Sequence, residues 1–159
     1  LLKEDRKRVI ASRGLNVSRS NRRLAVRERR SSAGSDTGGL MDKINLKEKL
    51  SKFSDYWSPK VIAEMNDYQF KLVKIQGEFV WHNHDDTDET FIVIEGEMKI
   101  EFENETVELS EGDMFVVPKG IEHKPWAENE CKVMIIEPRG VVNTGNAEGD
   151  LTASNEVWI

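Results

Sequence analysis

From Lys60 to Pro138 the chain alternates apolar and polar residues in short runs, and turn-forming residues separate these runs. Period-two runs rich in β-branched and aromatic residues are typical of β-strands with one buried face. The runs are KVIAEM, YQFKLVKI, EFVWHNH, TFIVIEG, MKIEFE, TVELS, DMFVVP, HKPWA and CKVMIIEP. About nine short strands in about 80 residues predict an all-β sandwich or barrel and exclude a βαβ protein. We therefore expect a barrel core over about residues 60–138.

Two local patterns add detail to this expectation. The run MKIEFENETVELS alternates on both sides of Asn104, which predicts a β-hairpin with one buried face. Before the strands, Leu46, Leu50 and Phe53 recur at helical spacing, and Asn45 stands where a helix N-cap would be. We expect a short amphipathic helix there, packed on the larger β-structure.

Residues 1–40 differ in composition from the remainder of the chain. They carry eleven Lys and Arg against four Asp and Glu and contain no aromatic residue, whereas residues 41–159 carry twelve against twenty-five. Without aromatic residues the first segment is poorly suited to build a core, so we expect a basic leader or linker followed by one domain over residues 41–159. Three origins of the leader stay open: sequence upstream of a natural start at Met41, a basic arm for nucleic acid or an anionic surface, and another native extension. We do not favour nucleic-acid binding.

The sequence also bears on location. No run approaches the roughly 18 to 20 apolar residues of a membrane span, and no apolar signal region opens the chain. Cys131 is the single cysteine, which excludes an internal disulfide and is typical of a small buried side chain. We expect a cytoplasmic protein without a membrane partner.

All three histidines of the chain lie in two short stretches. His82 and His84 are two residues apart on an expected strand, so period two puts both on one face. Glu89 follows an acidic turn, and His123 follows a Pro-x-Gly turn. Three neutral imidazole nitrogens and one carboxylate suit a divalent transition metal. Taken separately, a His-x-His pair is also common as surface decoration, and an acidic run as a solvated turn.

These stretches resemble the two motifs of the cupin superfamily. The matching residues are His82, His84, Glu89, Gly96, Gly112, Pro118, Gly120 and His123. Two details depart from the family pattern: Gly77 precedes His82 by one residue fewer than usual, and Ala127 stands where the family has Asn. That Asn is not a metal ligand in the family, so the departure does not affect the expected ligand set.

The resemblance covers about residues 61–138. It implies a double-stranded β-helix, or jelly-roll, barrel of the small single-domain kind described as mannose-6-phosphate-isomerase-like. It further implies one divalent transition metal per subunit (Fe, Mn, Zn or Ni), held by His82, His84, Glu89 and His123, and a homodimer.

The function expected from this resemblance is that of a metal-binding cupin that binds or acts on a small molecule in the barrel. Three classes stay open: a sugar-phosphate isomerase, an iron-dependent dioxygenase, and a metal-dependent binding or sensing module without turnover. A phosphate would need a basic anchor, for which the sequence offers Arg139, Lys71 and Lys74. Glu89 is the candidate catalytic residue, because the one anionic ligand is best able to leave the metal and accept a proton.

Three further expectations concern residues outside the motifs. Trp81 and Trp126 adjoin ligand histidines and are candidates to line a ligand pocket, whereas for Trp81 we favour packing on the outer face or a dimer contact. Residues 140–150 are glycine-rich without a phosphate-loop pattern, which indicates irregular coil. Trp158 and Ile159 are expected to dock the C-terminus on the barrel or on a partner subunit.

Overall fold

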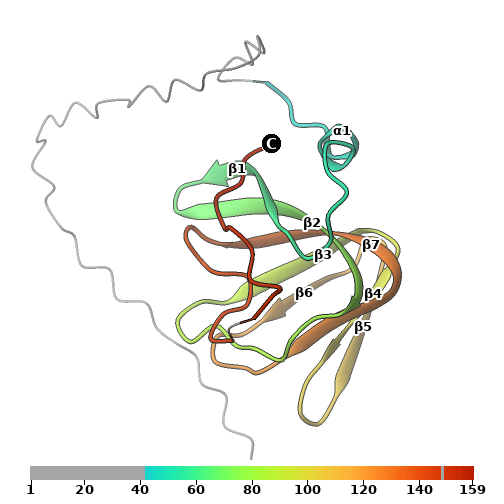
Figure 1. Cartoon of the computed structure of the whole chain (residues 1–159), viewed down its shortest axis with the longest axis vertical. Coiled ribbons are helices and arrows are strands. Elements are labelled where there is room, and N and C mark those ends of the chain that lie inside the picture. The colour runs from blue at the N-terminus through green and yellow to red at the C-terminus, as the bar shows by residue number, and fades with distance from the viewer. Residues whose placement is uncertain (1–41, 148) are drawn as a thin grey trace, which may run out of the picture. The chain divides into compact units, whose positions relative to one another are not determined.

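The computed structural model describes residues 42–147 and 149–159, so the expectations about residues 1–40 lie outside the described part. That part contains one short helix and seven strands (Figure 1). They are α1 (Leu46–Leu50), β1 (Lys60–Met65), β2 (Tyr68–Glu78), β3 (Glu89–Glu95), β4 (Glu97–Glu101), β5 (Thr106–Ser110), β6 (Met114–Val117) and β7 (Lys124–Pro138). No helix in the described ranges is long and apolar enough to cross a membrane.

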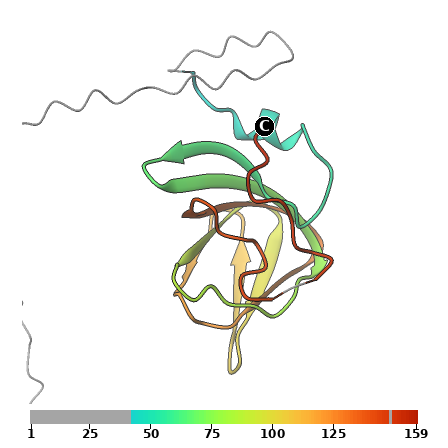
Figure 2. The same ribbon diagram turned by 60° about the vertical axis from the view of Figure 1, so that its left-hand side comes forward.

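The strands form one antiparallel sheet that curls around a core (Figures 1 and 2). Its order is β1-β2-β7-β3-β6, and β4 joins β7 while β5 pairs with β4. β2 runs along one edge of β7, whereas the other edge pairs first with β4 and then with β3. A long strand shared between two halves in this way bends the sheet into a jelly roll, which confirms the predicted fold class.

Two predicted strand boundaries were wrong. The runs HKPWA and CKVMIIEP belong to one strand, β7, because residues 128–130 form an exposed irregularity opposite the register shift between Ile75 and Gly77. The run EFVWHNH leaves the sheet after Glu78, and only His82 pairs again, in an isolated bridge with His123. The segment stays extended, but its backbone lacks a continuous partner strand.

The core inside the barrel is built from the alternating residues that face inward. On β7 these are Cys131, Val133 and Ile135, and on the β4–β5 hairpin Met98 lies opposite Leu109. Cys131 is fully buried, as expected, and its burial raises the pKa of the thiol to about 11. Burying each aliphatic side chain contributes about 1.5–3 kcal/mol, so this interior supplies much of the driving force for folding.

A second apolar cluster covers the outer face of the sheet. Leu50 of α1 packs with Ile62 and Leu72, and Ile159 adds to the same cluster. The Asn45 Oδ1 accepts a hydrogen bond of 3.1 Å from the backbone N–H at position 48, so the predicted helix and N-cap are confirmed. The C-terminal residues return to the barrel, where the Ile159 N–H donates to the carbonyl of Val61 at 3.2 Å. The expected docking of the C-terminus on the barrel is therefore observed.

Candidate metal centre

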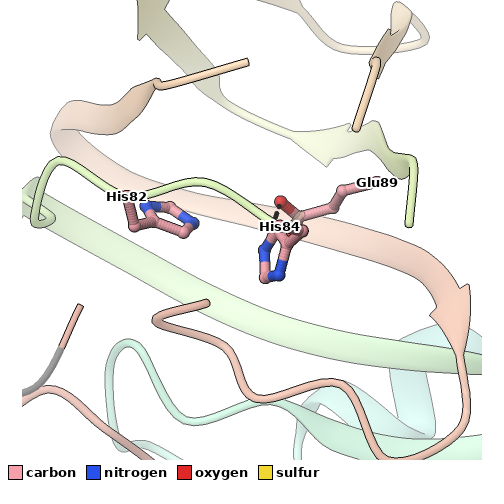
Figure 3. Close-up of side chains that lie close together, drawn as sticks. All are labelled: His82, His84 and Glu89. Carbon is pink, nitrogen blue, oxygen red and sulfur yellow. Dashed lines mark ion pairs between the residues drawn. The ribbon is translucent and has the colours of Figure 1, made fainter. Parts of the chain in front are cut away.

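His82 and His84 lie on the extended loop between β2 and β3, and both side chains are buried (Figure 3). Asn83, between the two histidines, is half-buried, and Trp81, just before His82, is 43% exposed. The alternation that the sequence predicted is therefore present, although the segment is not a strand. Extended backbone alone is enough to direct both imidazoles inward.

Glu89 opens β3 and turns its carboxylate toward the two histidines (Figure 3). Its Oε2 lies 3.3 Å from the Nε2 of His84. One ligand atom from each of His82, His84 and Glu89 lies within 4.8 Å of the others, and all three side chains are buried. The first motif of the sequence thus forms a compact set of atoms that could ligate a metal.

His123 reaches the same place from just before β7. Its backbone N–H and carbonyl exchange hydrogen bonds of 2.9 and 3.0 Å with the backbone of His82, and the two ring centroids are 4.3 Å apart. The Nε2 of His123 lies 3.3 Å from the Oε2 of Glu89. All four residues singled out in the sequence therefore meet in one buried cluster, although His123 stands outside the tighter set of three.

The protonation of two imidazoles follows from their backbone contacts. The Nδ1 of His82 is 3.0 Å from the carbonyl oxygen of Val80, and the Nδ1 of His123 is 3.0 Å from that of Ile121. A carbonyl oxygen only accepts, so in both rings Nδ1–H is the donor. Each neutral ring then keeps the lone pair of Nε2 for the site, which is the arrangement of metal-ligating histidines.

The Nε2 atoms of His123 and His84 lie beside the Glu89 carboxylate, which is itself an acceptor. The Nε2 of His84 is buried and has no hydrogen-bond partner within residues 42–147 and 149–159, despite its 3.3 Å approach to Glu89. Two ligands bound at right angles to one ion at about 2.1 Å would be about 3 Å apart, close to the observed spacing. The residues therefore fit a divalent cation held between them.

The cluster shifts the pKa values of His82, His84 and Glu89 in different directions. Burial, helped by the neighbouring His123, lowers the pKa of His82 to about 4. Burial also lowers the pKa of His84, but the contact with Glu89 outweighs it and the net shift is upward. Burial opposes ionisation of Glu89, yet its contacts with His123 and His84 prevail and lower its pKa to about 2. At neutral pH Glu89 is thus an ionised ligand and His82 a neutral one.

A cavity of about 30 Å³ adjoins the cluster inside the barrel. Most of its wall is apolar, and it includes Trp57, Val73, Phe79, Phe91, Val133 and Ile135. Its polar wall consists of His82, Glu89, Glu137 and Asn143. No lysine or arginine of the described segments lines it. Burial and the nearby Glu89 raise the pKa of Glu137 to about 7, against the opposing effect of Lys71.

The two tryptophans considered for a pocket do not line this cavity. Trp81 lies on the outside, with the Nζ of Lys124 5.6 Å from its ring centroid. Trp126 lies beneath Lys99, whose Nζ is 5.4 Å from the ring centroid. The outer-face interpretation is therefore the better one for Trp81, whereas Trp126 lines a separate pocket together with Lys99 and Glu108.

The segment after β7 has a role at the site that its sequence did not predict. The Asn146 N–H donates to the carbonyl of Asn83 at 3.1 Å, and the Asn146 Oδ1 accepts from the Asn83 N–H at 3.0 Å. A Cβ on Gly145 would lie 2.0 Å from the same Asn83 carbonyl oxygen. Residues expected to be mere coil thus hold the backbone between the two histidines, which Figures 1 and 2 show as neighbouring loops at one end of the barrel.

Several known proteins are similar to this chain in sequence or fold. Residues 70–137 match the cupin domain family. The protein YdbB of Bacillus subtilis (strain 168), described as uncharacterized, is 42% identical over 80 residues, and the match covers 50% of this chain and 65% of YdbB. The chain thus spans less than two thirds of that relative.

Two solved structures are similar over nearly their whole length. One is a cupin-2 domain containing protein from Shewanella frigidimarina, with 64% identity and a TM-score of 0.60 over 60% of this chain and 94% of that one. The other is the protein NMB1881 from Neisseria meningitidis, with 38% identity and a TM-score of 0.57 over 61% and 99% of the two chains.

Proposed function

Because this chain belongs to the cupin family, we propose that His82, His84, Glu89 and His123 hold one divalent transition metal per chain, which anchors a small ligand in the adjoining cavity. The observation that carries the proposal is the 3.3 Å approach of imidazole Nε2 atoms to Glu89 Oε2 in a buried cluster. The two imidazole nitrogens and the carboxylate oxygen are all potential metal ligands, and one shared cation would satisfy them together.

The chain's own residues have separate roles in this proposal. The carbonyls of Val80 and Ile121 fix the tautomers of His82 and His123, and Glu89 supplies the negative charge that offsets a dication. A metal bound here supplies Lewis acidity to an oxygen of the ligand. Glu89 also lines the cavity, so it is the group placed to take a proton from a bound ligand. Fe, Mn, Zn and Ni all suit such a ligand set.

The ligand class follows from the cavity wall. The three cations considered as phosphate anchors are engaged elsewhere: Lys71 pairs with Glu137 at 2.7 Å, Arg139 pairs with Glu64 at 2.8 Å, and Lys74 lies over the Phe53 ring. A sugar phosphate would therefore meet an apolar wall without a cation. This favours a small, mostly apolar ligand, and among enzyme classes it favours dioxygenase-type chemistry over a mannose-6-phosphate-isomerase-like reaction. A binding module without turnover would use the same cavity.

Metal stoichiometry tests the proposed function. The full chain, prepared without a histidine tag, is stripped with a chelator, reloaded with Mn²⁺ or Zn²⁺, and analysed by mass spectrometry for metal per chain. We expect one metal in the wild type and at least about tenfold weaker binding in His84→Ala and His123→Ala. The control is Glu108→Gln, an exposed acid on β5 that pairs with Lys99. Unchanged metal content in both histidine variants would refute the site.

The homodimer and the cytoplasmic location stay predictions. β6 stands at the end of the sheet order, and its Met114 is 61% exposed and Val116 also exposed. An open edge with exposed apolar side chains suits pairing with a second copy of the chain.

A further inference from the structure

An ion pair is buried at one end of the barrel interior, beside the proposed metal site. Lys71 of β2 is 1% exposed and Glu137 of β7 is 2% exposed, and the lysine Nζ lies 2.7 Å from the glutamate Oε1. Glu137 continues the inward-facing row of Val133 and Ile135, so it occupies a position where the barrel otherwise has apolar residues. Buried ion pairs rarely stabilise a protein more than apolar residues of similar volume do. Stability alone therefore does not explain this pair, and a role in ligand binding is the alternative.

The second oxygen of this glutamate has no partner. Glu137 Oε2 is buried and accepts no hydrogen bond from any group in the described ranges. Glu137 nevertheless lines the cavity together with His82 and Glu89. Lys71 Nζ makes its other contact with the carbonyl of Val141 at 3.4 Å, so it balances the charge of Glu137 without contacting Oε2. A buried acceptor without a donor is unfavourable and is usually satisfied by something that binds.

We propose that Glu137 Oε2 is the second recognition point of the ligand, and that it accepts a hydrogen bond from a hydroxyl or N–H group. This deepens the proposed function and rests on it, since the metal is the first point. The ligand class is then a small, mostly apolar molecule with a metal-binding oxygen at one end and a hydrogen-bond donor facing away from the metal. Anions such as phosphates are disfavoured, because Glu89 and Glu137 both face the cavity.

Two matched probes test this assignment. Acetohydroxamic acid and N-methylacetohydroxamic acid both chelate a metal through two oxygens, but only the first has an N–H, which points away from the chelated ion. Their affinities for the Zn²⁺-loaded full chain are measured by calorimetry at pH 8. We expect the wild type to prefer the N–H probe by about tenfold or more, because a hydrogen bond to a charged group contributes that much.

Variants separate the hydrogen bond from steric effects. Lys71→Met/Glu137→Leu removes both buried charges together, which avoids leaving one unpaired. We expect unchanged metal content and a preference below about twofold. Glu137→Gln keeps the volume and an oxygen for Lys71 but weakens the acceptor, so its preference should fall between the two. The matched control is Lys132→Met/Glu95→Leu, an exposed pair at 2.7 Å on the outside, which should behave as the wild type.

Results that would overturn the role of Glu137 differ from those that would overturn the metal site. Equal binding of both probes by the wild type would overturn it and leave Glu137 as a structural residue satisfied by water. A preference that persists in Lys71→Met/Glu137→Leu and in Glu137→Gln would assign the effect to the size of the N-methyl group. Failure of metal-loaded wild type to bind either probe would also overturn the inference, whereas failure to take up metal would overturn the proposed function itself.

Discussion

The carbonyls of Val80 and Ile121 decide which nitrogen of His82 and His123 faces the cluster. Because each carbonyl takes the Nδ1–H, the Nε2 atoms are left as lone-pair donors before any metal arrives. Glu89 adds the one negative charge and is ionised even though it is buried. At the scale of single residues, the cluster is therefore prepared for a cation, and two predictions follow from its protonation.

Metal binding should weaken as the pH falls, because protons compete for the same nitrogens. His84, whose pKa is raised above the ordinary histidine value of about 6.5, protonates first, while His82, with a pKa of about 4, stays neutral longest. A metal that binds only the folded state raises its melting temperature. The difference in melting temperature between metal-loaded and chelated protein should be large at pH 8 and shrink through pH 6.5 to pH 5. A difference that is independent of pH would show that these imidazoles do not bind the metal.

The substitution Glu89→Gln distinguishes catalysis from binding. It keeps the shape of the side chain but removes its charge and basicity. At equal metal content, we expect it to lower the turnover of any substrate that the wild type converts by about 10² to 10⁴, the range for loss of a general base. The measurement is single-turnover kinetics with metal content determined in the same samples. If ligand affinity falls only in step with metal occupancy, and neither protein forms product, the protein is a binding module.

Among the secondary-structure elements, the segment after β7 matters most for the site. It forms turns that contact the loop carrying both histidines, through Asn146 and Gly145. Gly145 has a φ of +51°, and a side chain there would meet the Asn83 carbonyl. This contact lies beyond residues 70–137, which match the cupin family. The support of the histidine loop thus includes residues outside the part of the chain that matches the family.

We therefore expect Gly145→Ala to weaken metal binding by about tenfold, the order of effect seen when a supporting contact is lost, while the barrel remains folded. The cause would be displacement of Asn83 and with it the neighbouring imidazoles. Metal titration and circular dichroism measure the two properties. Gly149→Ala is the control, because a Cβ there meets no atom within 4 Å. Equal losses in both variants, or none in Gly145→Ala, would contradict this role.

The elements also show what the sequence could predict. Alternation located the β4–β5 hairpin correctly, because its buried side chains share one face. It also located β1, although the first three residues of β1 are all buried and the last two are exposed. It failed at residues 79–84, since an extended run does not reveal whether its backbone finds a partner strand. The four cluster residues could be found because they lie in two compact motifs. Glu137 could not be found, because its partner Lys71 is 66 residues away in the sequence. In addition, only the folded sheet shows that the Glu137 side chain faces the barrel interior.

At the scale of the whole molecule, both apolar clusters lie within the described residues. The barrel interior is closed by the strands, and the outer cluster is covered by α1 and the C-terminal residues. A hydrogen bond of 2.6 Å from the Nζ of Lys49 to the carbonyl of Ile159 joins α1 to the C-terminal residues. The hydrogen bonds that position the histidines of the cluster come from residues 80–146.

A chain beginning at Met41 should therefore fold, bind one metal and form the same homodimer as the full chain. The measurements are the melting temperature, the metal content and the mass in solution by light scattering. We expect no change in metal content and a dimer in both. Unfolding, or a monomer produced only by the deletion, would show that residues 1–40 are part of the structure, and a monomer in both would refute the homodimer.

Anomalous diffraction from crystals of the metal-loaded protein tests most directly whether four named side chains hold one metal. Data collected on both sides of the metal absorption edge locate the ion without reference to its ligands. We predict one peak per chain, about 2.0 to 2.3 Å from the Nε2 atoms of His82, His84 and His123 and from a carboxylate oxygen of Glu89. A peak elsewhere, or a loaded structure in which any two of these side chains point into solvent, would contradict the account.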